Sequence, residues 1–115
     1  MHDRTVGNTI RMHRMRLGLS QRELATLLGY RTPWQVSRHE TNRSVPPLMI
    51  ALGYQEILGV PISELFPGMH ITISSAIQQS FRKFQEDLEA RVSDGNTAHR
   101  DAQKLQWVLQ RTTMV

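Results

Sequence analysis

The chain has 115 residues, no cysteine, and fourteen lysines and arginines against ten acidic residues, which gives a formal net charge of +4. This length allows one domain, or a small domain with an appendage, and a real hydrophobic core. The lack of cysteine excludes disulfide bonds and thiolate metal sites. No stretch approaches the roughly 18 apolar residues of a membrane span, and no long apolar run lies at the N-terminus. We therefore expect a cytoplasmic protein that does not associate with membranes.

The positive charge is concentrated in the first half of the chain. Residues 1–50 contain eight arginines and three acidic residues, whereas residues 51–115 contain six basic and seven acidic residues. Twelve of the fourteen basic residues are arginines, whose planar guanidinium groups suit phosphates and guanine edges. A solvent-exposed arginine-rich surface would give the same pattern, so charge alone leaves both interpretations open.

Two short helices are predicted first. The spacing of apolar residues predicts one helix over Thr5–Leu17. A second is predicted over about Gln21–Leu28, because Ser20 and Glu23 form the S-x-x-E pattern of a capping box. Gly29 permits the positive φ that ends this helix.

Three further helices complete the predicted N-terminal domain. The third spans about Pro33–Thr41, since proline is tolerated in a first helical turn. An apolar segment predicts the fourth over Leu48–Leu58, ended by Gly59. A single turn over Ile62–Phe66 follows, and Pro67-Gly68 is expected to break the chain. Five helices in so few residues indicate a compact all-α domain.

The remaining residues predict a helical hairpin, with a turn at residues 93–96 between two segments of helical apolar spacing. The apolar faces comprise Ile77, Phe81, Phe84, Leu88 and Val92 in the first segment, and Ala98, Ala102, Leu105, Trp107, Val108 and Leu109 in the second. Two such helices cover each other only in part. The leftover surface could contact a second copy of the chain, the N-terminal domain or another protein.

Several linked motifs follow one another along the chain: R-x-x-x-G-L-S-Q-x-E-L-A from Arg14 to Ala25, L-G at 28–29, V-S-R-x-E from Val36 to Glu40, a proline-marked exit, and A-L-G with L-G-V-P-I-S-E-L-F up to Phe66. In this order they resemble the phage repressor/Cro-type (XRE-like) helix-turn-helix transcriptional regulators, over residues 6–66. The resemblance implies a five-helix repressor-like DNA-binding domain at residues 1–68. The C-terminal helical hairpin at residues 69–115 lies outside it.

The chain departs from the family pattern at three places. It has one residue more than usual between Gly29 and Val36, so the start of the third helix is expected to bulge. His39 stands where an aliphatic or aromatic residue normally packs inward, and we interpret it as a semi-buried packing residue. Asn42 replaces the usual glycine, which asparagine tolerates because it accepts a left-handed conformation.

The resemblance also implies residue roles. Arg14 and Glu40 match a family pair that forms an internal salt bridge, so we assign them a structural role. The expected DNA-binding residues are Gln21, Arg31, Thr32, Pro33, Trp34, Gln35, Ser37, Arg38 and Arg43. Among them Arg38 is expected to bind guanine rather than phosphate, and Arg31 and Thr32 to touch phosphate. For Trp34 two placements stay open, against thymine methyl groups or folded back onto the core.

These observations favour a sequence-specific transcriptional regulator, a repressor rather than an activator, that acts as a homodimer on a pseudo-palindromic operator. The expected dimer interface is formed by Ile77, Phe81, Phe84, Leu88, Leu105, Trp107 and Leu109. One alternative is an antitoxin-like module whose hairpin binds a partner protein, with DNA binding used for autoregulation. Another is a coactivator without sequence specificity of its own.

Catalytic and metal chemistry are not expected. The five histidines are dispersed, and no phosphate-binding glycine loop, nucleophile elbow or catalytic carboxylate pair occurs. We therefore expect no enzyme activity, no metal and no cofactor. The partner that we expect, from the resemblance, is double-stranded DNA.

Overall fold

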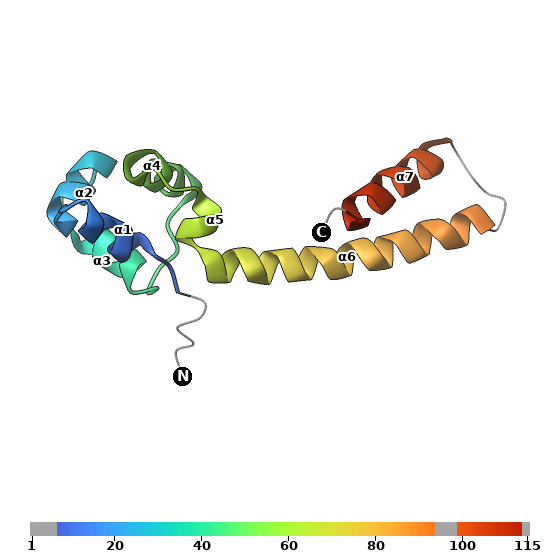
Figure 1. Ribbon diagram of the computed structural model, residues 1–115, viewed down its shortest axis with the longest axis horizontal. Helices are drawn as coiled ribbons and strands as arrows, with labels where there is room; N and C mark the ends of the chain where they lie inside the picture. Colours follow the sequence, from blue (N-terminus) through green and yellow to red (C-terminus); the bar gives the residue numbers. More distant parts are fainter. Residues whose placement is uncertain (1–6, 94–98, 114–115) are drawn as a thin grey trace. The chain divides into compact units, whose positions relative to one another are not determined.

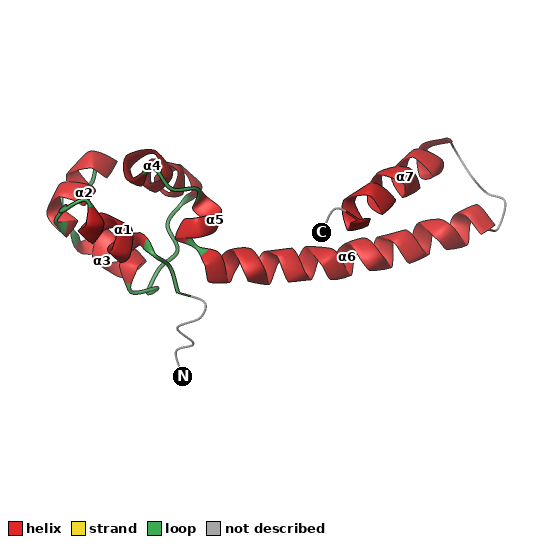
Figure 2. Ribbon diagram, viewed as in Figure 1, coloured by secondary structure: helices red, strands yellow, loops and turns green. Residues whose placement is uncertain are grey.

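The computed structural model describes residues 7–93 and 99–113, and their regular secondary structure is entirely helical (Figures 1 and 2). The all-α prediction is therefore confirmed. The helices, in chain order, are α1 Ile10–Arg16, α2 Gln21–Leu28, α3 Trp34–Glu40, α4 Leu48–Leu58, α5 Ile62–Leu65, α6 Pro67–Ser93 and α7 His99–Thr113. Contacts divide the chain into two compact units, residues 1–71 and 72–115. Within the described residues, no helix combines the length and the apolarity needed to cross a membrane.

The core of the first unit is shared by all of its short helices. Its largest fully buried side chains are Ile10, Leu24, Val36, Tyr54 and Leu65, one from each of α1 to α5. The close approach of α4 to α2 depends on Gly53, where an added Cβ would lie 2.8 Å from Leu28 Cδ2. This core fixes the orientation of α2 and α3, the two helices that carry the predicted site.

Three of these helices end in the same way. Gly18, Gly29 and Asn42 follow α1, α2 and α3 with φ of 72°, 88° and 59°. In each case the next amide donates to the carbonyl five residues back: Leu19 to Arg14 at 3.2 Å, Tyr30 to Ala25 at 2.9 Å, and Arg43 to Arg38 at 2.9 Å. This is the Schellman pattern of a left-handed helix ending. Asn42 adopts the left-handed conformation predicted for it.

The first helix is shorter than predicted. It begins at Ile10 rather than Thr5, because Asn8 Oδ1 accepts the Ile10 amide at 3.1 Å and the Thr9 amide donates to the Leu65 carbonyl at 2.9 Å. These bonds hold the chain in a non-helical path before α1. Leu17, the last residue of the predicted helix, is the C-cap of α1 and is 55% exposed. Residues 5 and 6 lie outside the described part of the chain.

The prediction that Pro67-Gly68 breaks the chain is wrong. α6 begins at Pro67, and the His70 amide donates to the Phe66 carbonyl at 2.9 Å. A proline in the first turn has no amide to satisfy, so it starts a helix as readily as it stops one. Sequence alone does not distinguish the two outcomes here.

In the second unit, α7 packs against α6. Leu88 and Val108 are fully buried, the rings of Phe81 and Trp107 lie 5.5 Å apart, and Arg91 pairs with Asp101 at 3.5 Å. Leu88 was predicted to face a second copy of the chain, but it is already covered within one chain. The part of the predicted turn that begins at Asp94 lies outside the described residues. Ala98, predicted for the apolar face of the second segment, lies outside them as well.

The other residues predicted for a dimer interface keep at least part of their surface. Ile77, Trp107 and Leu109 are exposed, and Phe81, Phe84 and Leu105 are half-buried.

Candidate nucleic-acid interface

The start of α2 is fixed by local hydrogen bonds. Ser20 Oγ accepts the Glu23 amide at 3.0 Å, and the Ser20 amide donates to Glu23 Oε1 at 2.9 Å. This reciprocal pair is the capping box predicted from the S-x-x-E pattern. The hydrogen bond from the Ser20 backbone lowers the pKa of Glu23, which keeps the carboxylate charged beside the helix N-terminus. Gln21 therefore has a fixed position as the first residue of α2.

A buried ion pair joins α1 to α3. Arg14 Nε donates to Glu40 Oε2 at 2.6 Å, and Arg14 Nη2 donates to Glu40 Oε1 at 3.1 Å. Arg14 Nη1 also donates to the Leu19 carbonyl at 2.8 Å, so the same side chain holds the turn before α2. The Glu40 side chain is only 2% exposed, and its hydrogen bond raises the pKa of Arg14. Arg14 thus faces the protein interior and is not placed to meet a ligand.

Gln21 belongs to the same network. Its Nε2 donates to Glu40 Oε1 at 3.0 Å, which ties the start of α2 to the last residue of α3. A side-chain amide carries two N–H donors, so this bond leaves one for another partner. Gln21 is half-buried, and its amide lies at the junction of the two helices rather than projecting away from the fold.

The turn before α3 is organised by Thr32. Its Oγ1 accepts the Trp34 amide at 3.4 Å and donates to Gln35 Oε1 at 3.2 Å. Pro33 follows as the N-cap with φ of −77°, and Arg31 and Thr32 are exposed. The Ser37 amide donates to the Pro33 carbonyl at 3.0 Å, so the first turn of α3 is regular. Gln35 is half-buried, and its carbonyl oxygen is held by the threonine hydroxyl.

The outer face of α3 presents Trp34 and Arg38. Trp34 is 62% exposed, so it does not fold back onto the core. The guanidinium carbon of Arg38, one helical turn later, lies 4.8 Å from the centre of the Trp34 ring. Arg38 Nη2 also donates to the Arg43 carbonyl at 3.3 Å. The two side chains form one stacked unit on the solvent side of the helix, with the half-buried Ser37 beside it.

The inner face of α3 is held by a neutral polar pair. His39 is 4% exposed, and its Nδ1 lies 2.8 Å from the hydroxyl of Tyr54 on α4. Burial lowers the pKa of His39, and the charge of Arg38 acts in the same direction. Burial also raises the pKa of Tyr54. His39 was interpreted as a packing residue, and it is in addition hydrogen-bonded. No pattern in the sequence identifies Tyr54 as its partner.

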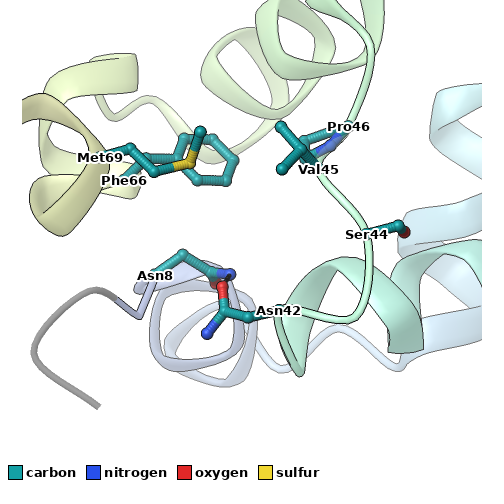
Figure 3. A pocket seen from close by; sticks show the side chains of 7 residues that line it. All are labelled: Asn8, Asn42, Ser44, Val45, Pro46, Phe66 and Met69. Carbon is teal, nitrogen blue, oxygen red and sulfur yellow. Dashed lines mark hydrogen bonds between the residues drawn. The ribbon is translucent and has the colours of Figure 1, made fainter. Parts of the chain in front are cut away.

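The end of α3 is tied to the residues before α1. Asn8 Nδ2 donates to the His39 carbonyl at 2.7 Å and to Asn42 Oδ1 at 2.8 Å. Figure 3 shows these two asparagines side by side at one edge of a pocket of about 200 Å³. The rest of its lining is mostly apolar and is provided by Ser44, Val45, Pro46, Phe66 and Met69. None of these lining residues is among the predicted DNA-binding residues.

Residues 10–65 match the family model described as helix-turn-helix. This match identifies residues 10–65 as a helix-turn-helix domain. This confirms the XRE-like resemblance, and the family is one of DNA-binding transcription regulators. No curated protein matches the chain.

The family assignment gives α2 and α3 their roles in this helix-turn-helix. The second helix of such a unit is the recognition helix, which lies in the major groove while the first crosses the phosphate backbone. In this pattern α3 occupies the place of the recognition helix. The nine predicted DNA-binding residues fall on four segments of the unit: Gln21 on α2, then Arg31, Thr32 and Pro33 in the turn, Trp34, Gln35, Ser37 and Arg38 on α3, and Arg43 in the loop after it.

Exposed arginines surround the helix-turn-helix. The exposed ones in the described part of the first unit are Arg11, Arg16, Arg22, Arg31 and Arg43, and none of them forms an ion pair with another described residue. Arg22, next to Gln21 on α2, was not among the predicted DNA-binding residues. Its position in the first turn of the helix that crosses the backbone makes it a candidate phosphate contact. Arg22 directly follows Gln21 in the sequence, and this position could have identified it as a candidate phosphate contact.

Proposed function

We propose that the chain is a sequence-specific transcriptional repressor that binds a pseudo-palindromic operator as a homodimer in the cytoplasm. In this proposal residues 1–68 bind DNA and residues 69–115 provide the dimerisation element. The observation that carries it is the outer face of α3, where the exposed Trp34 and the half-buried Arg38 form a stacked pair on a helix held rigidly by its inner face.

Base recognition is assigned to α3. An arginine binds guanine through two parallel N–H donors to O6 and N7. Arg38 has this fork on the solvent side of α3, and the bond to the Arg43 carbonyl occupies one of its five N–H donors. Gln21 adds one amide donor from the start of α2. We assign Arg31, Thr32 and Arg43 to phosphates because they are exposed in the loops on either side of the recognition helix.

Dimerisation is assigned to the second unit. Its two helices bury Leu88 and Val108 between them, but Ile77, Trp107 and Leu109 remain exposed. Two helices alone rarely form a stable core, whereas two hairpins together give a four-helix arrangement. A dimer also reaches two half-sites about 34 Å apart and so doubles the number of phosphate contacts.

The DNA-binding part is tested by selecting bound duplexes from a random pool. We expect enrichment of an inverted repeat with half-sites one helical turn apart. Arg38→Ala should relax the base preference at one position of each half-site, whereas Arg43→Ala should weaken binding to all sequences and lower the salt dependence. Arg100→Ala, at an exposed position in the second unit, is the matched control. Equal losses on every sequence for Arg38→Ala would assign that residue to phosphate, and no enrichment would refute sequence specificity.

The dimerisation part is tested by sedimentation of the purified chain. Ile77→Asp places a charge on the exposed apolar surface and should give a monomer, while Gln79→Asp places the same charge at an exposed polar position and should leave the dimer intact. An unchanged mass for Ile77→Asp would remove this surface from the interface.

The same exposed side chains support a second candidate, an antitoxin-like module whose hairpin binds a partner protein. The two candidates predict different sedimentation results. For the antitoxin-like module, the purified wild-type chain would sediment as a monomer or an aggregate, and it would stay soluble without aggregating when co-expressed with its partner. A homodimer formed by the chain alone favours the repressor.

A further inference from the structure

The stacked pair on the recognition helix has a chemistry that one arginine alone lacks. Trp34 offers an apolar ring, and Arg38 offers hydrogen-bond donors beside it, with 4.8 Å between the guanidinium carbon and the ring centre. The positions are four apart on one helix, so both side chains lie on the same face. An apolar surface and a forked donor side by side form a composite ligand-binding element.

Major-groove chemistry contains a matching pair of features. The only apolar group on the base edges of the groove is the 5-methyl of thymine, and guanine presents the N7 and O6 acceptors. Where thymine neighbours guanine, a methyl group and two acceptors lie side by side. We propose that Trp34 and Arg38 together bind a thymine–guanine step, with the Trp34 ring on the thymine methyl and the Arg38 fork on the guanine edge. This inference rests on the proposed DNA-binding function.

The geometry of Arg38 supports this assignment. Its guanidinium is fixed on one side by the Trp34 ring and on another by the Arg43 carbonyl at 3.3 Å. A side chain held in place before binding loses less conformational freedom when it binds. A phosphate contact needs less fixation, since a flexible lysine also binds phosphate as a point charge.

The exposure of Trp34 supports its part in the pair. The ring is 62% exposed although it sits at the first position of a helix whose inner face has a well-filled core. Its neighbours do not compete for the same base. Gln35 has its carbonyl oxygen on Thr32, so the paired amide geometry that reads adenine is not formed there.

The test uses base analogues in the duplex selected from the random pool. Replacing thymidine by deoxyuridine removes the methyl alone, and replacing guanine by 7-deazaguanine removes the N7 acceptor alone. For the wild-type chain we expect one thymine beside a guanine at which deoxyuridine weakens binding about fourfold per half-site, the value of one buried methyl group. 5-Methyldeoxycytidine at that position should retain the methyl contact.

The variants assign each effect to a side chain. Trp34→Ala should bind the thymidine and deoxyuridine duplexes equally, while Arg38→Ala should become insensitive to 7-deazaguanine. Trp34→Phe keeps an aromatic ring and should preserve part of the methyl effect. Met49→Ala removes an apolar side chain that is 78% exposed on α4, and it should retain the full fourfold difference. Circular dichroism of each variant checks the fold.

The outcomes separate this inference from the function on which it rests. If a duplex is enriched and bound, but deoxyuridine beside guanine has no effect on the wild-type chain, or Trp34→Ala keeps the fourfold difference, the inference is overturned and the DNA-binding function stands. If no duplex is enriched, the proposed function itself fails.

Discussion

Removing the Arg14 guanidinium should destabilise the first unit more than any surface substitution. Arg14→Met keeps an unbranched side chain but removes three donors, two to Glu40 and one to the Leu19 carbonyl. Glu40, 2% exposed, would keep only the Gln21 amide among the donors described here. Breaking one partner of a buried pair costs about 3–5 kcal/mol, and the remaining amide places this case near 3 kcal/mol. For a domain of this size such a loss corresponds to a fall in Tm of roughly 12–24 °C.

The assay follows the first unit separately by using its own tryptophan. In a Trp107→Phe background Trp34 is the remaining tryptophan of the chain, so its fluorescence in urea reports on the first unit. The double variant Arg14→Met/Glu40→Met replaces the pair by apolar side chains and should recover much of the lost stability. A loss below about 1 kcal/mol for Arg14→Met, or a double variant as unstable as the sum of the two single ones, would refute the reasoning.

Three further predictions concern the packing around the site and in the hairpin. Because burial lowers the pKa of His39, the unfolded chain binds this proton more readily, so the free energy of unfolding should fall as pH drops below 6.5; His39→Gln should reduce that dependence in urea titrations at several pH values. Asn42→Ala should be less stable than Asn42→Gly by about 1 kcal/mol, since both lose the bond from Asn8 but only alanine resists a φ of 59°; equal unfolding midpoints would contradict this. Leu88→Ala should cost the second unit about 2–5 kcal/mol, seen as an earlier transition of Trp107 fluorescence, and a matching shift of Trp34 would show that the units do not unfold separately.

Local chemistry in the sequence predicted much of the first unit. The bounds of α2 and α4 follow from a capping box, from glycines with positive φ, and from apolar spacing, all of which act within a few residues. The start of α1 was missed because it depends on a bond from Thr9 to the Leu65 carbonyl, far away in the sequence. Pro67 was misjudged because the same residue type begins and ends helices.

Side-chain pairing at the site was less accessible to sequence reasoning. The contact between Arg14 and Glu40 joins residues 26 apart, and it was the family resemblance, not a spacing, that implied it. The hydrogen bond between His39 and Tyr54 had no signal in the sequence, since a histidine in an apolar position looks the same whether or not a hydroxyl faces it. The stacking of Arg38 on Trp34 is consistent with their i, i+4 spacing, but the exposure of the tryptophan required coordinates.

The left-handed endings of α1, α2 and α3 bear on how the polypeptide reaches its native state. Each of these hydrogen bonds joins groups five residues apart. A growing chain can therefore form these turns before its later segments are synthesised. Topologies dominated by such short-range closures refold on the order of microseconds to milliseconds. The contact of Arg14 with Glu40 joins residues 26 apart, so it closes a longer loop that contains two of these turns.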